Sequence, residues 1–205
     1  MEEEEKTLTD EYERIRHSTD SEELSKLARE ELKKEEVGEE EFAIRSALLE
    51  AVAANKATPK EDRVYMACSS SFPNILVRLS TDEERDVRKA VAANKSSKNW
   101  LLSKLAKDEN EEVREEAIKN PNSSWKAKLD AAQNPLSSPR LLRFLSEIGK
   151  ESAEGTKEFV LSSMVRSSAA RNPSCPQEAL HSLMEDNSPE VRKAAEKRVS
   201  PDNVQ

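Results

Sequence analysis

The sequence predicts an all-helical chain built from repeated pairs of short helices, and three observations indicate that class. Only 3 glycines occur in 205 residues, too few for the many tight turns of a sheet protein. The apolar residues recur with the three- and four-residue spacing of amphipathic helices. A segment of the chain also returns at a shift of 26 residues, with its apolar, acidic and basic positions in register. Such self-similarity is typical of repeat proteins.

The repeat is clearest between residues 70–88 (SSFPNILVRLSTDEERDVR) and residues 96–114 (SSKNWLLSKLAKDENEEVR). In each unit a first helix carries an L-x-x-L stripe, such as Leu102 and Leu105, and a second helix carries an apolar stripe of its own. Residues 172–201 fit the same pattern further along the chain. We therefore expect helix pairs, called helix A and helix B, that stack one after another.

An asparagine closes helix B in most units, as Asn94, Asn120 and Asn172 show. Proline follows directly at Pro121 and Pro173, where it prevents the helix from continuing. Asn tolerates the left-handed backbone conformation better than most other residues with a side chain. We therefore expect these asparagines to end their helices in that conformation.

An Asp and an Arg also recur, the Asp in the turn between the helices and the Arg six residues later in the first turn of helix B. We expect the Asp and the Arg of one unit to meet, and stacked units to arrange such pairs in a ladder, with bonds between units as an option. The alternative is an Arg row that binds phosphates or carboxylates, which the acid near each Arg disfavours. The ladder residues are Asp82, Arg88, Asp108, Arg114, Asp186 and Arg192.

The net charge of -8 is unevenly distributed. Residues 1–41 contain 17 acidic and 7 basic residues, a net of -10, and the remaining residues carry a net of +2. A surface that binds duplex nucleic acid normally has a clear basic excess, so nucleic acid is disfavoured as a partner. We expect residues 1–17 to form a separate acidic helical segment that frays. Whether residues 1–41 act as an intramolecular lid or as an interaction tail is left open.

Residues 18–205 are expected to form one repeat domain that is not fully regular. Two helices stand alone, and two units are enlarged and contain long B helices of similar placement. This arrangement indicates either a duplication or two reinforced sites. The lone helices are 58–69 and 123–134, and the enlarged units are 18–55 and 135–172.

The string D-x5-R-x-A-[VA]-A-x-N-[PK]-x-x-P, repeated every 26 residues, resembles the variant leucine-rich repeats, relatives of the HEAT and armadillo solenoids. The matching segments are DVRKAVAANKSS, EVREEAIKNPNSS, VRSSAARNPSCP and EVRKAAEKR. The likeness covers roughly residues 18–200. It implies a right-handed α-solenoid, a superhelix of short HEAT-like helical pairs. It implies no particular function, because such solenoids serve many roles.

No residues of the sequence assemble a catalytic or metal site. One member type of the family holds an iron–sulfur centre in an N-terminal cysteine cluster, but Cys68 and Cys175 lie far apart. Related di-iron hydroxylases use His-Glu pairs, and neither His17 nor His181 is followed by Glu. We therefore expect no enzyme and no cofactor. Cys68 is expected to be a half-buried helix end and Cys175 an exposed loop residue.

Trp100 is the strongest candidate for contact with a partner. Its counterparts in the repeat, Asn74 and Glu178, are polar and so expected at the surface. Trp is enriched at binding hot spots. The alternative is that Trp100 covers a crevice beside the neighbouring irregular unit. Trp125, which pairs with Leu129 at helical spacing, is expected in the core.

In HEAT-like solenoids the row of B helices lines the concave face, which is the usual binding surface. The exposed positions expected there mix charges, which suits a protein or peptide better than nucleic acid. We therefore expect a non-enzymatic, cytoplasmic scaffold for protein–protein interaction, with no membrane contact. The alternative is a HEAT-like nucleic-acid-binding or DNA-repair glycosylase-type protein, which requires a basic groove. The expected partner-binding residues on helix B are Lys89, Glu115, Glu116, Lys119, Ser167, Lys193 and Lys197.

Overall fold

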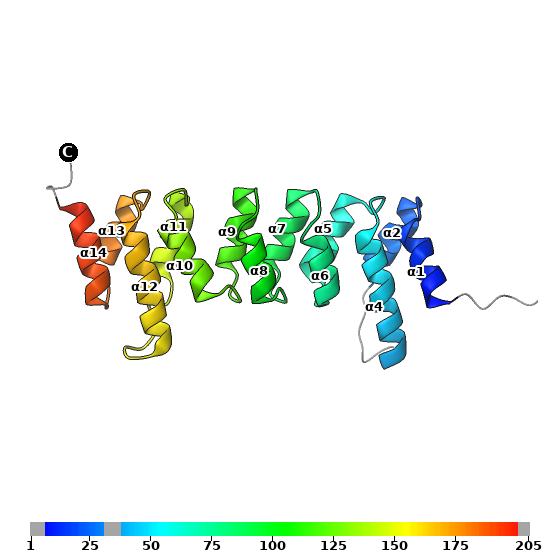
Figure 1. Cartoon of the computed structure of the whole chain (residues 1–205), viewed down its shortest axis with the longest axis horizontal. Coiled ribbons are helices and arrows are strands. Elements are labelled where there is room, and N and C mark those ends of the chain that lie inside the picture. The colour runs from blue at the N-terminus through cyan, green and yellow to red at the C-terminus, as the bar shows by residue number, and fades with distance from the viewer. Residues whose placement is uncertain (1–6, 31–37, 201–205) are drawn as a thin grey trace, which may run out of the picture. The chain divides into compact units, whose positions relative to one another are not determined.

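The computed structural model describes residues 7–30 and 38–200, and every regular element among them is an α-helix (Figure 1). The predicted all-helical class is therefore confirmed for this part of the chain. The chain separates into two compact units, residues 1–122 and residues 123–205. The sequence predicts one repeat domain over residues 18–205 with two enlarged units of similar placement, and that prediction stays open.

Unit one consists of short helices that pack in two rows. Helix α7 packs between α5 and α9, while α6 and α8 pack against α7 from the other row. The L-x-x-L stripe of α8 faces this packing, since Leu102 and Leu105 are buried. The helices are α1 (Leu8–Arg16), α2 (Ser21–Ala28), α4 (Glu39–Ala54), α5 (Lys60–Ser69), α6 (Pro73–Leu79), α7 (Arg85–Ala93), α8 (Asn99–Leu105) and α9 (Glu111–Lys119).

The N-terminal helix is a packed part of unit one. Helix α1 lies against α4, and its Ile15 is only 1% exposed. Thr7 caps the helix by accepting a hydrogen bond from the Asp10 amide, and the Asp10 carboxylate accepts one from the Thr7 amide. Residues 8–16 are thus helical, as predicted for the segment 1–17, and the boundary at residue 17 stays a prediction. Residues 1–6 lie outside the described part of the chain.

Unit two repeats this arrangement around a longer helix. Helix α12 packs between α10 and α14, and α11 and α13 pack against α12. Leu142 and Leu145 of α11 and Leu180 and Leu183 of α13 are buried, as their L-x-x-L spacing predicts. The helices are α10 (Trp125–Gln133), α11 (Pro139–Glu147), α12 (Lys157–Arg171), α13 (Gln177–Leu183) and α14 (Pro189–Val199).

Two B helices are longer than the rest, as the sequence predicts. Helix α4 has 16 residues and α12 has 15, whereas the other described helices have 11 or fewer. The N-terminal half of α4 is only partly covered, and Ile44 is exposed. Phe42 in this half contacts the ring of Phe72, with ring centroids 5.2 Å apart. The extra turns of α4 therefore extend past the core of the unit.

The asparagines at the helix ends do not use the left-handed conformation. Asn94 and Asn120 have φ values of -66° and -58°, and among the described residues only glycines have positive φ. The expectation was wrong because the side chain, not the backbone, ends the helix. The Asn94 Oδ1 accepts a hydrogen bond from the Ser96 amide at 2.7 Å, which turns the chain.

The Nδ2 group of each asparagine amide reaches the preceding repeat. Asn94 Nδ2 donates to the carbonyls of Ala67, Cys68 and Ser70 at 2.8, 3.1 and 2.9 Å. Asn120 repeats this contact with the end of α7. These carbonyls lie at the ends of α5 and α7, where the last carbonyls of a helix have no partner within that helix. The recurring asparagine therefore joins successive helix ends.

None of the helices in residues 7–30 and 38–200 is long and apolar enough to cross a membrane.

Candidate functional site

Buried ion pairs connect helix B of one repeat to the A–B turn of the next repeat. Arg88 binds Asp108 through Nε and Nη2, at 2.8 and 3.0 Å. In unit two, Arg166 binds Asp186 in the same two-bond geometry at 2.7 and 3.0 Å. Burial works to raise the pKa of Asp108, but hydrogen bonds from Arg88 hold that pKa below its ordinary value. The paired charges are thus buried where successive repeats pack together.

This pairing differs from the expected one, in which the Asp and the Arg of the same repeat bind each other. Arg88 binds Asp82 of its own unit only at the backbone carbonyl, 2.8 Å from Nη1. The Asp82 carboxylate is instead paired with Arg63, with Nε 2.9 Å from Oδ2. Arg114 and Arg192 also donate to carbonyls of the A–B turn. The ladder therefore links neighbouring repeats through bonds between Arg and Asp side chains. An Arg of helix B also holds the A–B turn of its own repeat by donating to backbone carbonyls there.

The predicted helix-B surface carries charges that are already paired. Lys89 Nζ lies 2.6 Å from Glu112 of the next helix B, and Lys60 Nζ lies 2.5 Å from Asp86. The bond to Asp86 raises the pKa of Lys60, and the bond to Lys89 lowers the pKa of Glu112. A partner that used these groups would have to break existing contacts.

Two residues expected on that surface are buried. Glu115 is 7% exposed and binds Lys119 at 2.9 Å, one turn along α9. Ser167 is 4% exposed because α12 is covered on both sides by α10 and α14. The repeat marks both positions as outward-facing, but neither offers a surface to a partner. Glu116 and Lys119 are partly covered, whereas Lys193 and Lys197 of α14 are exposed.

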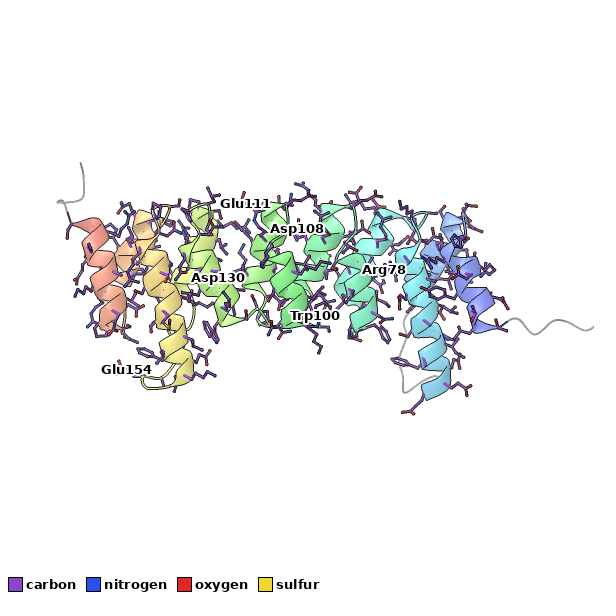
Figure 2. All side chains as sticks on the ribbon, in the orientation of Figure 1. Arg78, Trp100, Asp108, Glu111, Asp130 and Glu154 are labelled. Carbon is purple, nitrogen blue, oxygen red and sulfur yellow. The ribbon has the colours of Figure 1, made fainter. Side chains whose placement is uncertain are left out.

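Trp100 lies at the surface, as the sequence predicts. It is 57% exposed on α8 (Figure 2). Its counterparts Asn74 and Glu178 are exposed as well. Burying such a ring against a partner removes a large apolar area from water.

Cations without ion pairs accompany Trp100 on α6 and α8. Lys104 lies one helical turn after Trp100 on α8, and Arg78 occupies the corresponding position on α6. Figure 2 labels Arg78 and Trp100. Lys98 and Lys107 stand just before and just after α8. All four are exposed, and none forms an ion pair with a described residue. We call Arg78, Lys98, Trp100, Lys104 and Lys107 the Trp100 face.

The second tryptophan is not a core residue. Trp125 is partly exposed, and the ammonium of Lys128 lies 5.1 Å from the centre of its ring. Lys128 is 7% exposed, and burial lowers its pKa. The i, i+4 pattern with Leu129 had indicated that Trp125 lies in the core. The ring instead forms a cation–π contact with Lys128 and stays partly in solvent.

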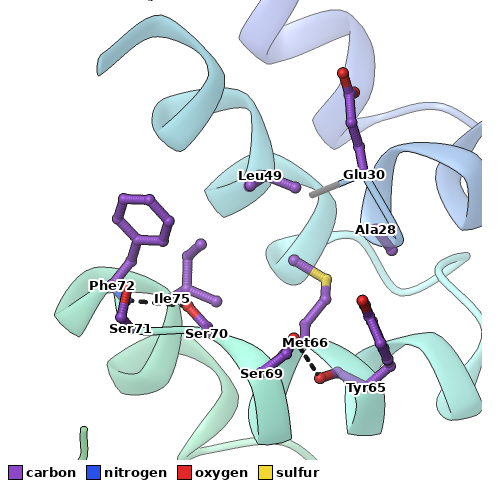
Figure 3. A pocket seen from close by; sticks show the side chains of 10 residues that line it. All are labelled: Ala28, Glu30, Leu49, Tyr65, Met66, Ser69, Ser70, Ser71, Phe72 and Ile75. Atoms are coloured by element: carbon purple, nitrogen blue, oxygen red, sulfur yellow. Dashed lines mark hydrogen bonds between the residues drawn. The ribbon is translucent and has the colours of Figure 1, made fainter. Parts of the chain in front are cut away.

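A cavity of about 300 Å³ lies in unit one, where α2, α4, α5 and α6 meet (Figure 3). Sequence reasoning missed this cavity because its walls come from four segments separated along the chain. The hydroxyl of Ser69 donates to the Tyr65 carbonyl at 2.8 Å, and the Phe72 amide donates to Ser70 Oγ at 3.1 Å. The lining residues are Ala28, Glu30, Leu49, Tyr65, Met66, Ser69, Ser70, Ser71, Phe72 and Ile75.

The thiols are placed opposite to expectation. Cys175 is buried and Cys68 is exposed. Burial raises the pKa of Cys175 to about 11. Within the described residues, no three or more His, Cys, Asp or Glu side chains are grouped so that they could hold a metal ion.

No family model, curated protein or solved structure matches this chain. Its function must be inferred from its own residues.

Proposed function

We propose that this chain is a non-enzymatic repeat scaffold that binds another protein through the Trp100 face. The observation that carries the proposal is Trp100, a large apolar side chain left more than half exposed, on a face whose cations form no ion pair with a described residue. Tryptophan is among the residues that contribute most to binding free energy when a partner covers them.

The scaffold we propose is a right-handed α-solenoid of HEAT-like helix pairs with a period of about 26 residues. Asn94 and Asn120 support this period, since each donates to a carbonyl 26 residues earlier in the chain. The Arg88–Asp108 and Arg166–Asp186 bonds support it too, because each joins residues 20 apart and the next Arg of the pattern follows six residues after that Asp. In such an architecture the residues that join successive repeats are internal, and the exposed faces are available to a partner.

The chemistry of the Trp100 face favours an acidic protein segment. Neither α6 nor α8 contains an acidic residue, so Arg78 and Lys104 face solvent with their charge unneutralised by their own helices. Carboxylates of a partner would pair with these cations and speed its approach. The two free thiols support a reducing compartment, and we propose the cytoplasm.

The helix-B row, which the sequence favoured, is the weaker candidate for the contact. Lys89 is bound to Glu112 of the next helix B, Lys119 is bound to Glu115 of its own helix, and Glu115 is buried. Exchanging these ion pairs for new ones offers little net gain, because each exposed pair contributes about 0–1 kcal/mol.

Nucleic acid is the second candidate, because exposed Trp and unpaired cations also suit single-stranded nucleic acid, whose bases stack on aromatic rings. Glu109 of the adjacent turn is 88% exposed and would repel the phosphates of a nucleic acid as well as the carboxylates of a protein, so the nuclease control in the experiment below distinguishes the two candidates. A DNA-repair glycosylase would need a basic groove around its catalytic residues as well.

Affinity capture from a lysate of the source organism, at low and moderate salt and with nuclease treatment, tests the proposal. We expect a discrete set of proteins that survives nuclease, is lost with Trp100→Ala and Lys104→Glu, and is retained with Lys89→Ala as the helix-B control. Loss with Lys89→Ala alone would move the contact to helix B. Recovery of nuclease-sensitive material alone would favour nucleic acid.

A further inference from the structure

Unit one carries a projecting aromatic side chain and, elsewhere on the same unit, a cavity of matching chemistry. Trp100 projects from α8, and α8 contributes no residue to the walls of the cavity. The cavity volume of about 300 Å³ is at the lower limit of ligand pockets, roughly 300–1,000 Å³. A site of this size suits one ring system such as an indole.

The walls of the cavity have the chemistry to hold that ring. Leu49, Met66 and Ile75 provide apolar surface, and the flexible thioether of Met66 adapts to the shape of a bound group. Tyr65 and Phe72 add aromatic surface to the lining (Figure 3). Arg29 lies over one face of the Tyr65 ring, 5.4 Å from its centre, and Phe42 packs against Phe72, so the remaining edges and faces of the two rings are the ones that an indole would contact. Buried tryptophan also requires an acceptor for its indole N–H, and the carboxylate of Glu30 belongs to the lining. Glu30 Oε1 accepts a hydrogen bond from Arg45 at 2.7 Å, and a carboxylate has further acceptor sites for the indole.

Charge favours a second copy of this chain as the source of the ring. Residues 1–41, which supply Ala28 and Glu30 of the cavity, carry a net charge of -10. Trp100 is instead accompanied by the exposed, unpaired cations Arg78 and Lys104. The acidic end of one copy would therefore attract the Trp100 face of another before the apolar contact forms.

We propose that Trp100 of one copy inserts into the cavity of a second copy. This inference rests on the proposed function, because it names the acidic partner of the Trp100 face. The two contacting surfaces differ, so the contact is heterologous and each added copy presents a new Trp100 and a new cavity. Self-association therefore increases with protein concentration and is weakened by salt.

Sedimentation velocity over a range of protein concentrations, at low and high salt, tests this contact. Wild type is expected to form assemblies larger than two chains at low salt. Trp100→Ala removes the ring, and Ser71→Trp blocks the cavity from an exposed position of its lining. Each is expected to weaken association at least about tenfold. Leu136→Ala and Ser200→Trp, exposed positions in unit two, serve as matched controls and leave association unchanged.

Mixing the two variants gives the decisive result. Trp100→Ala retains its cavity and Ser71→Trp retains its Trp100, so the mixture is expected to form a complex of two chains that stops growing. If both variants are folded by circular dichroism and the mixture stays monomeric, the inference is overturned. Monomeric wild type at every concentration overturns it as well.

A fluorescence measurement keeps the test decisive if Ser71→Trp does not fold. Trp100 and Trp125 are the 2 tryptophans of the chain, so a Trp125→Phe variant reports on Trp100 alone. Its emission should shift to shorter wavelength as the concentration rises, because the ring leaves water. Constant emission overturns the inference. If the Trp100-dependent capture persists while self-association is absent, the inference fails and the proposed function stands.

Discussion

Asn120 donates its side-chain N–H to the backbone carbonyl of Asn94, 2.9 Å away and 26 residues earlier in the chain. A second bond joins the same amide to the carbonyl of Ala92 at 2.8 Å. The end of α7 therefore depends on a side chain from the end of α9. Folding of one helix pair and the next should be coupled through this amide.

Asn120→Ala is expected to lower the free energy of unfolding by roughly 1–3 kcal/mol, because it leaves buried carbonyls without a donor. Urea denaturation followed by circular dichroism measures the loss. Asn134→Ala is the matched control: Asn134 also ends a helix, α10, and its Oδ1 accepts a hydrogen bond from the amide two residues on, at 3.0 Å, but the residue is exposed. Equal losses for the two variants would contradict the role of the cross-unit bond.

The Arg166–Asp186 pair is expected to be the most sensitive contact of unit two. Its side chains are 1% and 0% exposed, and removing one partner leaves a buried charge. We expect Arg166→Met to cost about 3–5 kcal/mol. The exposed pair of Lys126 and Asp130 is the control, and Lys126→Met should cost about 0–1 kcal/mol. Chemical denaturation compares the two, and a cost for Arg166→Met within the range of the control would refute the expectation.

Apolar periodicity was sufficient to predict the helices, because each L-x-x-L stripe can be buried only on one side of a helix. It was sufficient for α6, α8, α11 and α13, and for the long helices α4 and α12. It could not predict that Glu115 and Ser167 are buried, since burial of a polar residue depends on how closely neighbouring helices approach. The surface of helix B was therefore predicted less well than its core.

Spacing also revealed which polar residues recur but not how they are bonded. The six-residue interval between Asp82 and Arg88 indicated a pair within one unit, whereas Arg88 in fact binds Asp108 of the next. A pair within one repeat and a pair between repeats give the same sequence pattern, and only the stacking distance between repeats decides which of the two forms. Trp100 was recognised because it replaces a polar residue at a position of the repeat where its counterparts Asn74 and Glu178 are exposed.

The Arg88–Asp108 pair is expected to make stability depend on pH in the acid range. The pKa of Asp108 lies below its ordinary value of 3.8 in the folded protein. Its stabilisation is therefore complete above the unfolded pKa and is lost as the pH falls through the lower folded-state pKa. The free energy of unfolding, measured by urea titration at a series of pH values, should fall as the pH drops below about 4. Asp108→Asn should flatten that dependence.

Glu109→Gln is the neighbouring control for this titration. Glu109 also lies near Arg88, at 3.2 Å, but its side chain is 88% exposed. Screening by water makes its contribution small, so the acid dependence should remain close to that of wild type. A curve for Glu109→Gln as flat as that for Asp108→Asn would show that the buried pair is not the cause.

The two thiols should react at very different rates in the folded protein. Cys68 is exposed, whereas burial excludes reagents from Cys175 and raises its pKa to about 11 from an ordinary 9.0. The thiolate is the reactive form, so its fraction at mildly alkaline pH falls about 100-fold for Cys175. With a thiol-specific chromogenic reagent we expect one fast thiol in native protein, none in Cys68→Ser, and both in urea. Rapid reaction of native Cys68→Ser would contradict the burial of Cys175.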